Sequence, residues 1–205
     1  MTKVYVEGFN QSIRNMFKAY NWECVDEPAN AELICPEGGA DVDPSLYGEK
    51  NVASHVSAVR DKMSKSLYDL ARYNNTPITG ICRGGQFLNV MNGGKMWQDV
   101  NGHAIGGTHL VYDIATDRGI PCSSTHHQMM RMGYDGDLVA HGYNRSTRRI
   151  NADGEHYKPF DELDTEVVWY PKTKSLCFQP HPEMFEKGHP CTEYFFELLN
   201  RYMGF

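Results

Sequence analysis

TPITGICRGGQFLNVMNGG, residues 76 to 94, holds one cysteine, Cys82, between two short apolar segments. Residues 76 to 81 predict a buried strand, because a brief apolar run beside turn residues is typical of one. Residues 83 to 92 predict a short apolar helix, and the glycines at 93 and 94 are the residue type that most often follows a helix end. A strand, a sharp turn at Cys82 and a helix are therefore expected in direct succession.

The chain before this stretch also alternates between expected strands and helices. Residues 4 to 6 and 31 to 35 are short apolar runs that predict strands, and residues 10 to 20 predict a helix capped by Asn10. A further helix is expected where apolar residues recur at helical spacing on one face, namely Val59, Met63, Leu67, Leu70 and Ala71. This order predicts an α/β fold with a mostly parallel central sheet.

The second half of the chain is less regular until near its end. Residues 95 to 160 are rich in polar residues and turns. Residues 166 to 170 and 175 to 178 predict a hairpin. A final helix is expected with one apolar face, made of Tyr194, Phe195, Leu198, Leu199 and Tyr202. Residues 1 to 205 are expected to form a single domain, since this length suits one hydrophobic core.

Composition and charge exclude two classes of function. The chain of 205 residues carries 20 Lys and Arg against 26 Asp and Glu, a net charge of −6, without a long basic run. Nucleic-acid binding needs a concentrated basic patch, so we expect no nucleic-acid partner. The apolar stretches fall far short of the ~20 residues that cross a bilayer, and residues 1 to 10 lack the features of a signal peptide, so no membrane contact is expected.

The six cysteines are expected to be reduced thiols of a cytoplasmic protein, because the chain contains no Cys-x-x-Cys pair. His126, His127 and His189 lie near Cys122 and Cys191 in the sequence, which raises the question of zinc. Structural zinc sites usually pair their ligands at short fixed spacing, and no such pair occurs here. Neither a metal nor another cofactor is therefore expected.

Cys82 is surrounded by features that a cysteine nucleophile needs. Gly80-Ile81-Cys82-Arg83-Gly84 matches the Gly-x-nucleophile-x-Gly turn between a strand and a helix, with sulfur in place of a hydroxyl. The helix N-terminus favours the thiolate, and the backbone N–H of Arg83 is placed to donate to an oxyanion. For this pattern alone, a buried core thiol is the alternative interpretation.

Two further segments offer partners for Cys82. His181 and Glu183 stand two residues apart, a spacing that directs both side chains the same way in extended chain, so Glu183 could orient His181 as a base. Gly38 and Gly39 follow an expected strand, where backbone N–H groups could supply the second oxyanion donor. Taken singly, a polar surface loop and a plain turn explain these segments as well.

Four segments together resemble the class I glutamine amidotransferase superfamily, and more closely its γ-glutamyl-γ-aminobutyrate hydrolase and γ-glutamyl hydrolase branch. They are GGADVDPSLYGE at 38–49, GICRGGQFLNVMNGG at 80–94, SSTHHQ at 123–128 and HPE at 181–183. The first is specific to this branch, and GKMWQD at 94–99 is similar to a run that reads G-x-L-x-Q-D there. The matches follow in order along nearly the whole chain. The resemblance implies a three-layer α/β/α sandwich of the flavodoxin-like type with a mostly parallel central sheet.

The resemblance also implies roles for particular residues. It implies a catalytic triad, which consists of Cys82, His181 and Glu183. Gln86, one turn into the helix after the nucleophile, would contact a γ-glutamyl group. His127 and Gln128 fall where the branch lines its substrate pocket, although adjacent histidines in a loop could also be surface residues. Glu166 matches the strand that precedes the HPE strand in the family, and a structural role is expected for it.

The sequence departs from the branch at two places near the expected site. Pro180 stands before His181 where relatives usually carry an aromatic residue, and it restrains the backbone next to the expected base. Glu37 puts a carboxylate beside the expected oxyanion loop, which is unfavourable unless the side chain points away. If His181 were held away from the nucleophile, His126 or His127 would become the candidate base.

The leading hypothesis is hydrolysis of a γ-glutamyl amide, either glutamine or a γ-glutamyl amine, through a glutamyl thioester on Cys82. The second hypothesis is a glutaminase subunit that passes ammonia to a separate synthetase, because the chain leaves no room for an ATP-dependent domain. The third is a catalytically silent binding module on the same fold. An intact cysteine, histidine and glutamate argue against this third hypothesis.

Overall fold

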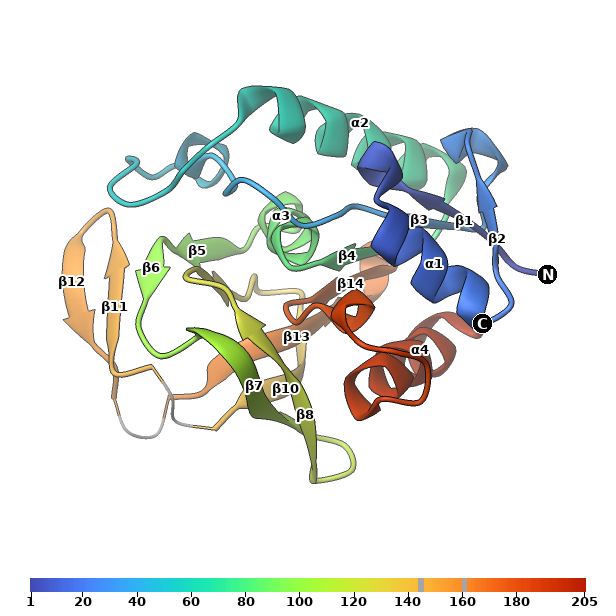
Figure 1. Cartoon of the computed structure of the whole chain (residues 1–205). Coiled ribbons are helices and arrows are strands. Elements are labelled where there is room, and N and C mark those ends of the chain that lie inside the picture. The colour runs from blue at the N-terminus through green and yellow to red at the C-terminus, as the bar shows by residue number, and fades with distance from the viewer. Residues whose placement is uncertain (144–145, 160–161) are drawn as a thin grey trace.

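The computed structural model describes residues 1–143, 146–159 and 162–205, and a twisted sheet runs through its centre (Figure 1). Within these residues the sheet has nine strands, in the spatial order β2 (Glu23–Val25), β1 (Lys3–Val6), β3 (Leu33–Cys35), β4 (Ile78–Ile81), β14 (Ser175–Phe178), β13 (Asp164–Tyr170), β10 (Asp137–Gly142), β7 (Ala104–Asp113) and β8 (Arg118–Thr125). Neighbours from β2 to β14 are parallel. Neighbours from β14 to β8 are antiparallel, so the sheet extends beyond its parallel half.

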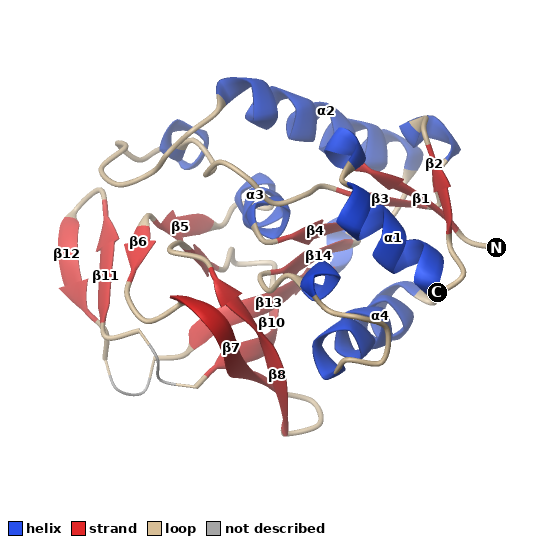
Figure 2. Cartoon of the chain, in the orientation of Figure 1, coloured by secondary structure: helices blue, strands red, loops and turns tan. Residues whose placement is uncertain are grey.

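Helices cover both faces of the parallel half, which makes three layers (Figure 2). The helices are α1 (Gln11–Ala19), α2 (Ala58–Asn74), α3 (Arg83–Met91) and α4 (Pro190–Met203). α1 and α4 share one hydrophobic core with the sheet, in which Phe17 and Phe195 are fully buried. α2 and α3 share the second core, which contains Leu67 and Phe87. The predicted α/β class with its three layers is confirmed.

The local signals of the first 94 residues are confirmed with small shifts of the element bounds. The Asn10 side chain accepts a hydrogen bond from the Ile13 N–H at 3.1 Å, so it caps α1 as expected. α3 ends just before Gly93, whose φ of 83° lies in the region that favours glycine. The predicted hairpin is also present, because β13 and β14 pair in antiparallel register.

The predicted apolar face of α2 is wrong in its first two turns. Val59 and Met63 are 70% and 43% exposed, whereas Leu67 and Ala71 are buried. The buried residues of the first two turns are the polar Asp61 and Ser64, and only the later turns bring apolar side chains to the core. Helical spacing alone does not show where along its length a helix meets its neighbours.

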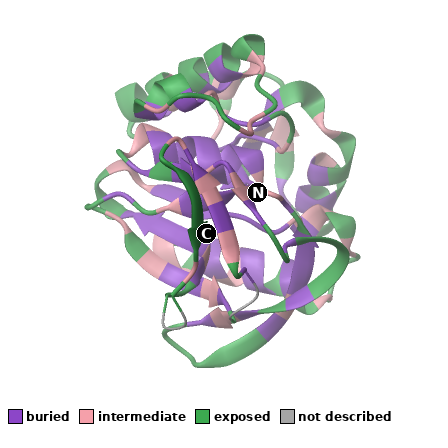
Figure 3. Cartoon of the chain, turned by 90° about the vertical axis from the view of Figure 1, so that its left-hand side faces the viewer, coloured by how far each residue is buried: buried purple, intermediate pink, exposed green. Residues whose placement is uncertain are grey.

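The polar middle of the chain forms strands that the sequence pattern did not indicate. β7 and β8 make the antiparallel edge of the central sheet, and two small sheets lie beside it. The small sheets contain β5 (Lys95–Trp97) with β9 (Met129–Arg131), and β12 (Gly154–Tyr157) with β11 (Arg148–Asn151) and β6 (Asp99–Val100). β12 is exposed along its whole length, so it shows no alternation of apolar and polar residues. Figure 3 shows buried residues concentrated in the central strands and exposed ones on the outer elements.

Several connections contain short 3-10 helices, which are η1 (Glu7–Phe9), η2 (Pro28–Asn30), η3 (Pro44–Tyr47), η4 (Pro171–Thr173) and η5 (Pro182–Met184). All six cysteines are free thiols. None of the helices in the described ranges is both long and apolar enough to span a bilayer. The carboxyl ends of β3, β4 and β14 meet at one edge of the parallel half. Open α/β sheets usually bind their ligands at this edge.

Candidate active site

Cys82 occupies a strained turn between β4 and α3. Its φ of 51° and ψ of −114° are rare for a residue with a side chain, and such strain is concentrated at functional sites. The Cys82 N–H donates to the Phe178 carbonyl at 2.8 Å, which ties the turn to β14. The thiol is partly exposed at the N-terminus of α3. This position favours the thiolate, because the helix dipole is positive there.

The turn needs glycines on both sides of Cys82, because backbone atoms lie where the Cβ of any other residue would be. A Cβ on Gly80 would lie 2.2 Å from the Gly84 carbonyl carbon, and a Cβ on Gly84 would lie 2.3 Å from the Pro36 carbonyl oxygen. Real Cβ atoms essentially never approach backbone so closely. The Gly-x-Cys-x-Gly pattern is therefore required by the packing of the turn.

His181 connects Glu183 to Cys82. The His181 Nδ1 lies 2.7 Å from Glu183 Oε1. Burial lowers the pKa of His181, but the neighbouring Cys82 and Glu183 side chains outweigh burial and raise the pKa from 6.5 to about 10. A protonated imidazole beside the sulfur stabilises a thiolate.

Pro180 does not hold His181 away from the nucleophile. The chain beyond Pro180 is fixed by Ser123 on β8, whose hydroxyl accepts the His181 N–H at 2.7 Å. This bond supplies an anchor where the proline offers no N–H of its own. His126 and His127, the alternative bases, have other partners.

Gly38 lies against both Cys82 and His181. A Cβ placed on Gly38 would be 3.0 Å from His181 Cε1 and 3.7 Å from Cys82 Cβ. The Gly38 carbonyl accepts from Arg60 Nη2 at 3.1 Å, and Gly39, with a φ of 143°, turns the chain beside the same guanidinium. The structure thus brings the loop after β3 to the nucleophile, as the sequence predicted.

The Glu37 carboxylate points away from the side of the loop that faces Cys82. Its Oε1 pairs with Arg60 Nη1 at 3.0 Å and packs so closely on Gly8 that a Cβ there would be 2.1 Å away. The Arg60 guanidinium balances the charge of Glu37 and also lies 3.9 Å from buried Glu7. Glu37 therefore does not oppose an oxyanion near Cys82.

The Arg83 side chain is buried and connects the start of α3 to neighbouring segments of the chain. It is 1% exposed, donates from Nε to the Ala40 carbonyl at 3.2 Å, and pairs with Asp61. Burial lowers the pKa of Arg83, and the Asp61 carboxylate opposes this shift. The buried pair holds the start of α3 and the chain after Gly39 together, which leaves the Arg83 backbone N–H at the helix N-terminus beside Cys82.

Gln86 reaches Cys82 only through Gln179, a residue that the sequence analysis missed. Gln86 Nε2 donates to Gln179 Oε1 at 3.1 Å, and Gln179 Nε2 donates to Cys82 Sγ at 3.6 Å. Both amides are buried. The signal for Gln179 was its position two residues before His181, since extended chain directs alternate side chains the same way.

His127 and Gln128 differ in their surroundings. The His127 side chain is 37% exposed and lies between Asp41, at 3.2 Å, and Asp99, at 3.4 Å. These carboxylates raise the pKa of His127, and the bond to Asp41 contributes most. Gln128 is buried, and its amide donates to Ser54 Oγ at 2.7 Å, so it supports the chain around residue 54. Of the two, only His127 is open to a bound molecule.

Three of the residues weighed for zinc in the sequence, Cys122, Cys191 and His189, have separate partners. Cys122 and Cys191 are buried against each other, and burial together with this contact raises the pKa of Cys122. The His189 ring stacks on Phe185 with a centroid distance of 3.8 Å. Among the described residues, one other group has metal-ligating atoms close together, namely His103, His109, His126 and Glu166.

The fold and this arrangement define a class I glutamine amidotransferase-like protein. The chain belongs to the peptidase C26 family, which it matches over residues 30–154. In an alignment of 164 residues the chain is 30% identical to the "Putative glutamine amidotransferase-like protein YvdE" of Lactococcus lactis, and the match covers 69% of this chain and 66% of that protein. In an overlapping alignment of 177 residues it is 31% identical to the "Putative glutamine amidotransferase Rv2859c" of Mycobacterium tuberculosis, and the match covers 75% of this chain and 53% of that protein. The chain thus covers less than two thirds of either relative.

The fold is also found in solved structures of low sequence identity. A GMP synthase subunit of Thermoplasma acidophilum, described as putative, superimposes with a TM-score of 0.64 and 15% identity. The superposition covers 99% of this chain and 96% of that one. At this identity the likeness concerns the fold alone.

Proposed function

We propose that this chain hydrolyses a γ-glutamyl amide, glutamine or a γ-glutamyl amine, with Cys82, His181 and Glu183 as its catalytic triad. The observation that carries the proposal is the position of His181, which is hydrogen-bonded to Glu183 and lies against the same glycine, Gly38, as Cys82. This is the order in which a nucleophile, its base and the orienting group act.

The proposed reaction has two steps. The Cys82 thiolate attacks the amide carbonyl carbon, and N–H groups of Arg83 and of Gly38 or Gly39 stabilise the oxyanion. The His181 imidazolium then protonates the departing amine as the C–N bond breaks, leaving a glutamyl thioester on the sulfur. Neutral His181 next takes a proton from water, the hydroxide attacks the thioester, and the thiol is released with glutamate.

The substrate side of the proposal concerns four residues. Gln179 and Gln86 form a buried amide pair next to the sulfur and would position the γ-carbonyl and the glutamyl group. His127, half-exposed among carboxylates, would contact the amine side of the substrate. The Asp41 carboxylate and the His127 imidazole would offer a negative and a positive charge to the amine side of the substrate, which suits a polar amine.

A second candidate is a glutaminase subunit that delivers ammonia to a separate synthetase. It is favoured by the near-complete superposition on a chain described as part of a GMP synthase. The chemistry at Cys82 would be the same, and the two candidates differ in what happens to the ammonia.

The test is a turnover assay on the purified chain with glutamine and a panel of γ-glutamyl amines. We expect turnover of at least one amine without any partner, and no turnover by Cys82→Ser. Cys24→Ser, which removes another partly exposed free thiol, should behave as wild type. Turnover that persists in Cys82→Ser would overturn the proposal. Glutamine turnover that appears only with an added synthetase would favour the second candidate.

A further inference from the structure

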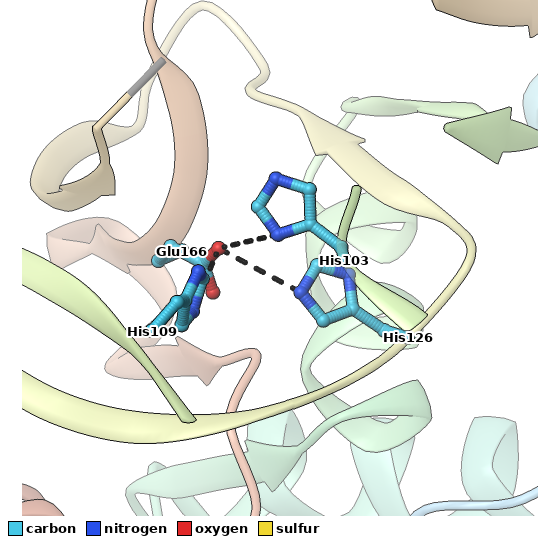
Figure 4. A group of neighbouring side chains, drawn as sticks. All are labelled: His103, His109, His126 and Glu166. Atoms are coloured by element: carbon cyan, nitrogen blue, oxygen red, sulfur yellow. Dashed lines mark ion pairs between the residues drawn. The ribbon is translucent and has the colours of Figure 1, made fainter. Parts of the chain in front are cut away.

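Three histidines surround one carboxylate in the interior of the protein (Figure 4). They are His103, which precedes β7, His109 within β7, and His126, which follows β8, and the carboxylate is Glu166 on β13. All four side chains are at least 95% buried. Burial of so many ionisable groups is costly unless a partner compensates their charge or lone pairs.

The four side chains converge on a small volume. Glu166 Oε1 lies 3.2 Å from His103 Nδ1, 3.4 Å from His109 Nε2 and 3.6 Å from His126 Nε2. One ligating atom from each residue lies within 4.8 Å of all the others. Within the described chain, His103 Nδ1, His126 Nε2 and both Glu166 oxygens are nevertheless buried without a hydrogen-bond partner. His103 Nδ1, His126 Nε2 and Glu166 Oε1 are therefore close together without a hydrogen bond between them.

His126 and His103 each form a hydrogen bond to a group outside the cluster. These bonds show which nitrogen of each ring carries a lone pair that is directed into the cluster. His126 Nδ1 is 2.7 Å from the Gln128 carbonyl, which can only accept, so Nδ1 carries the proton and a neutral ring presents a lone pair at Nε2. His103 Nε2 is 2.8 Å from Asp164 Oδ2, so its neutral ring likewise presents Nδ1. Two lone pairs and a carboxylate then point at the same space. A metal cation bound in this space would compensate both the lone pairs and the carboxylate.

We propose that His103, His109, His126 and Glu166 bind one divalent transition-metal ion, with zinc as the expected occupant. Three imidazoles and a carboxylate are a donor set that suits zinc. Zinc ligands at about 2.0–2.2 Å on tetrahedral vertices are about 3.3–3.6 Å apart, which matches the three separations around Glu166 Oε1. The remaining separations are all within 4.8 Å.

The outer bonds also match those of metal-binding histidines. Such histidines almost always donate their second N–H to a carboxylate or a backbone carbonyl, which fixes the ring and its tautomer. Asp164 fulfils this role for His103, and the Gln128 carbonyl fulfils it for His126. With four protein ligands and no exposure, the site is closed, as structural zinc sites are.

The ion would stabilise the part of the sheet that holds the candidate active site. It would cross-link β7, the end of β8 and β13. Ser124 on β8 donates to the His103 carbonyl at 2.7 Å, and its neighbour Ser123 accepts the His181 N–H. The Glu166 carbonyl accepts the Gln179 N–H at 2.9 Å. The inference itself does not depend on the proposed hydrolase function, because it concerns metal binding and stability.

The experiment uses the full chain without a purification tag, stripped of metal with a chelator. Zn²⁺ is titrated against a chromophoric chelator, and thermal unfolding is followed at each free zinc concentration. We expect one Zn²⁺ per chain and a melting temperature that rises with free zinc, since the ion binds the folded state. His126→Ala and Glu166→Gln should each weaken zinc affinity at least tenfold. His156→Ala, which removes an exposed histidine of β12, is the matched control and should leave the affinity unchanged.

Three outcomes would overturn the inference. In the first, the wild-type chain takes up no stoichiometric Zn²⁺, and its melting temperature does not respond to the metal. In the second, His156→Ala loses as much affinity as His126→Ala. In the third, His126→Ala and Glu166→Gln fold and bind zinc as tightly as wild type. If those variants fail to fold, the wild-type titration alone decides, because it requires no substitution.

Discussion

At the scale of single residues, the site depends on how Glu183 and Cys82 act together on His181. The imidazole is largely buried, which by itself disfavours its charged form. A carboxylate at 2.7 Å from one nitrogen and the neighbouring Cys82 thiol reverse this preference. His181 is therefore expected to hold a proton at neutral pH, ready to donate to a leaving amine.

This gives a prediction for the titration of His181. Its ring should titrate near pH 10 in the folded chain, against 6.5 when unfolded, and Glu183→Gln should lower that value by removing the carboxylate. Because the folded-state pKa is the higher one, the stabilisation is fully present below pH 6.5 and is lost as the pH rises through about 10. NMR titration of the histidine ring signals measures both values. An unshifted signal in wild type, or no change in Glu183→Gln, would contradict the prediction.

Gln179 is predicted to activate the sulfur through its N–H. Gln179→Ala removes the amide that donates to Cys82 Sγ, and a hydrogen bond to a charged acceptor contributes about 1.5–3 kcal/mol. We expect the alkylation rate of Cys82 at neutral pH to fall about tenfold or more, as about 1.4 kcal/mol is a factor of ten. Gln11→Ala, at an exposed position of α1, should leave the rate unchanged. Equal rates in wild type and Gln179→Ala would exclude this role.

At the scale of elements, the turn between β4 and α3 is determined by backbone packing. The same glycines that mark the motif in the sequence are those on which Pro36 and the start of α3 pack. The strand, turn and helix could therefore be predicted from residues 76 to 94 alone. The strands β5, β6, β9 and β10 could not, because each of them pairs with a strand distant in sequence.

Gly84→Ala is expected to lower the free energy of unfolding by about 1–3 kcal/mol, since the added Cβ would meet the Pro36 carbonyl at 2.3 Å. Gly107→Ala is the matched control, because a Cβ on that strand glycine meets nothing within 4 Å. It should change the free energy by less than about 0.5 kcal/mol. Urea denaturation measures both. Similar midpoints for the two variants would show that the turn is not packed as described.

At the scale of the whole molecule, the fold brings together residues that are distant in sequence and that no local pattern connects. Cys82 and the His181-Glu183 pair could be found because each lies in a short motif at a strand end. The four cluster residues, His103, His109, His126 and Glu166, come from β7, β8, β13 and their connections, so no fixed spacing links them. The contact of Gln179 with Cys82 follows from the pairing of β14 with β4, which the position of Gln179 two residues before His181 does not show.

The six cysteine thiols also differ from one another in their burial and in their neighbours. Burial raises the pKa of Cys24, Cys35 and Cys177, and the buried contact with Cys191 raises that of Cys122. Cys191 is fully buried. Cys82 alone among the six combines partial exposure, a helix N-terminus and a contact with His181. It should therefore be the reactive thiol.

Brief labelling with a glutamine-analogue electrophile, followed by peptide mass spectrometry, tests the central claim that Cys82 is a nucleophile activated by His181. We predict that Cys82 is labelled before the other five cysteines and that His181→Ala slows this labelling specifically. Labelling of Cys24 as fast as Cys82, or a Cys82 rate unaffected by His181→Ala, would contradict the account.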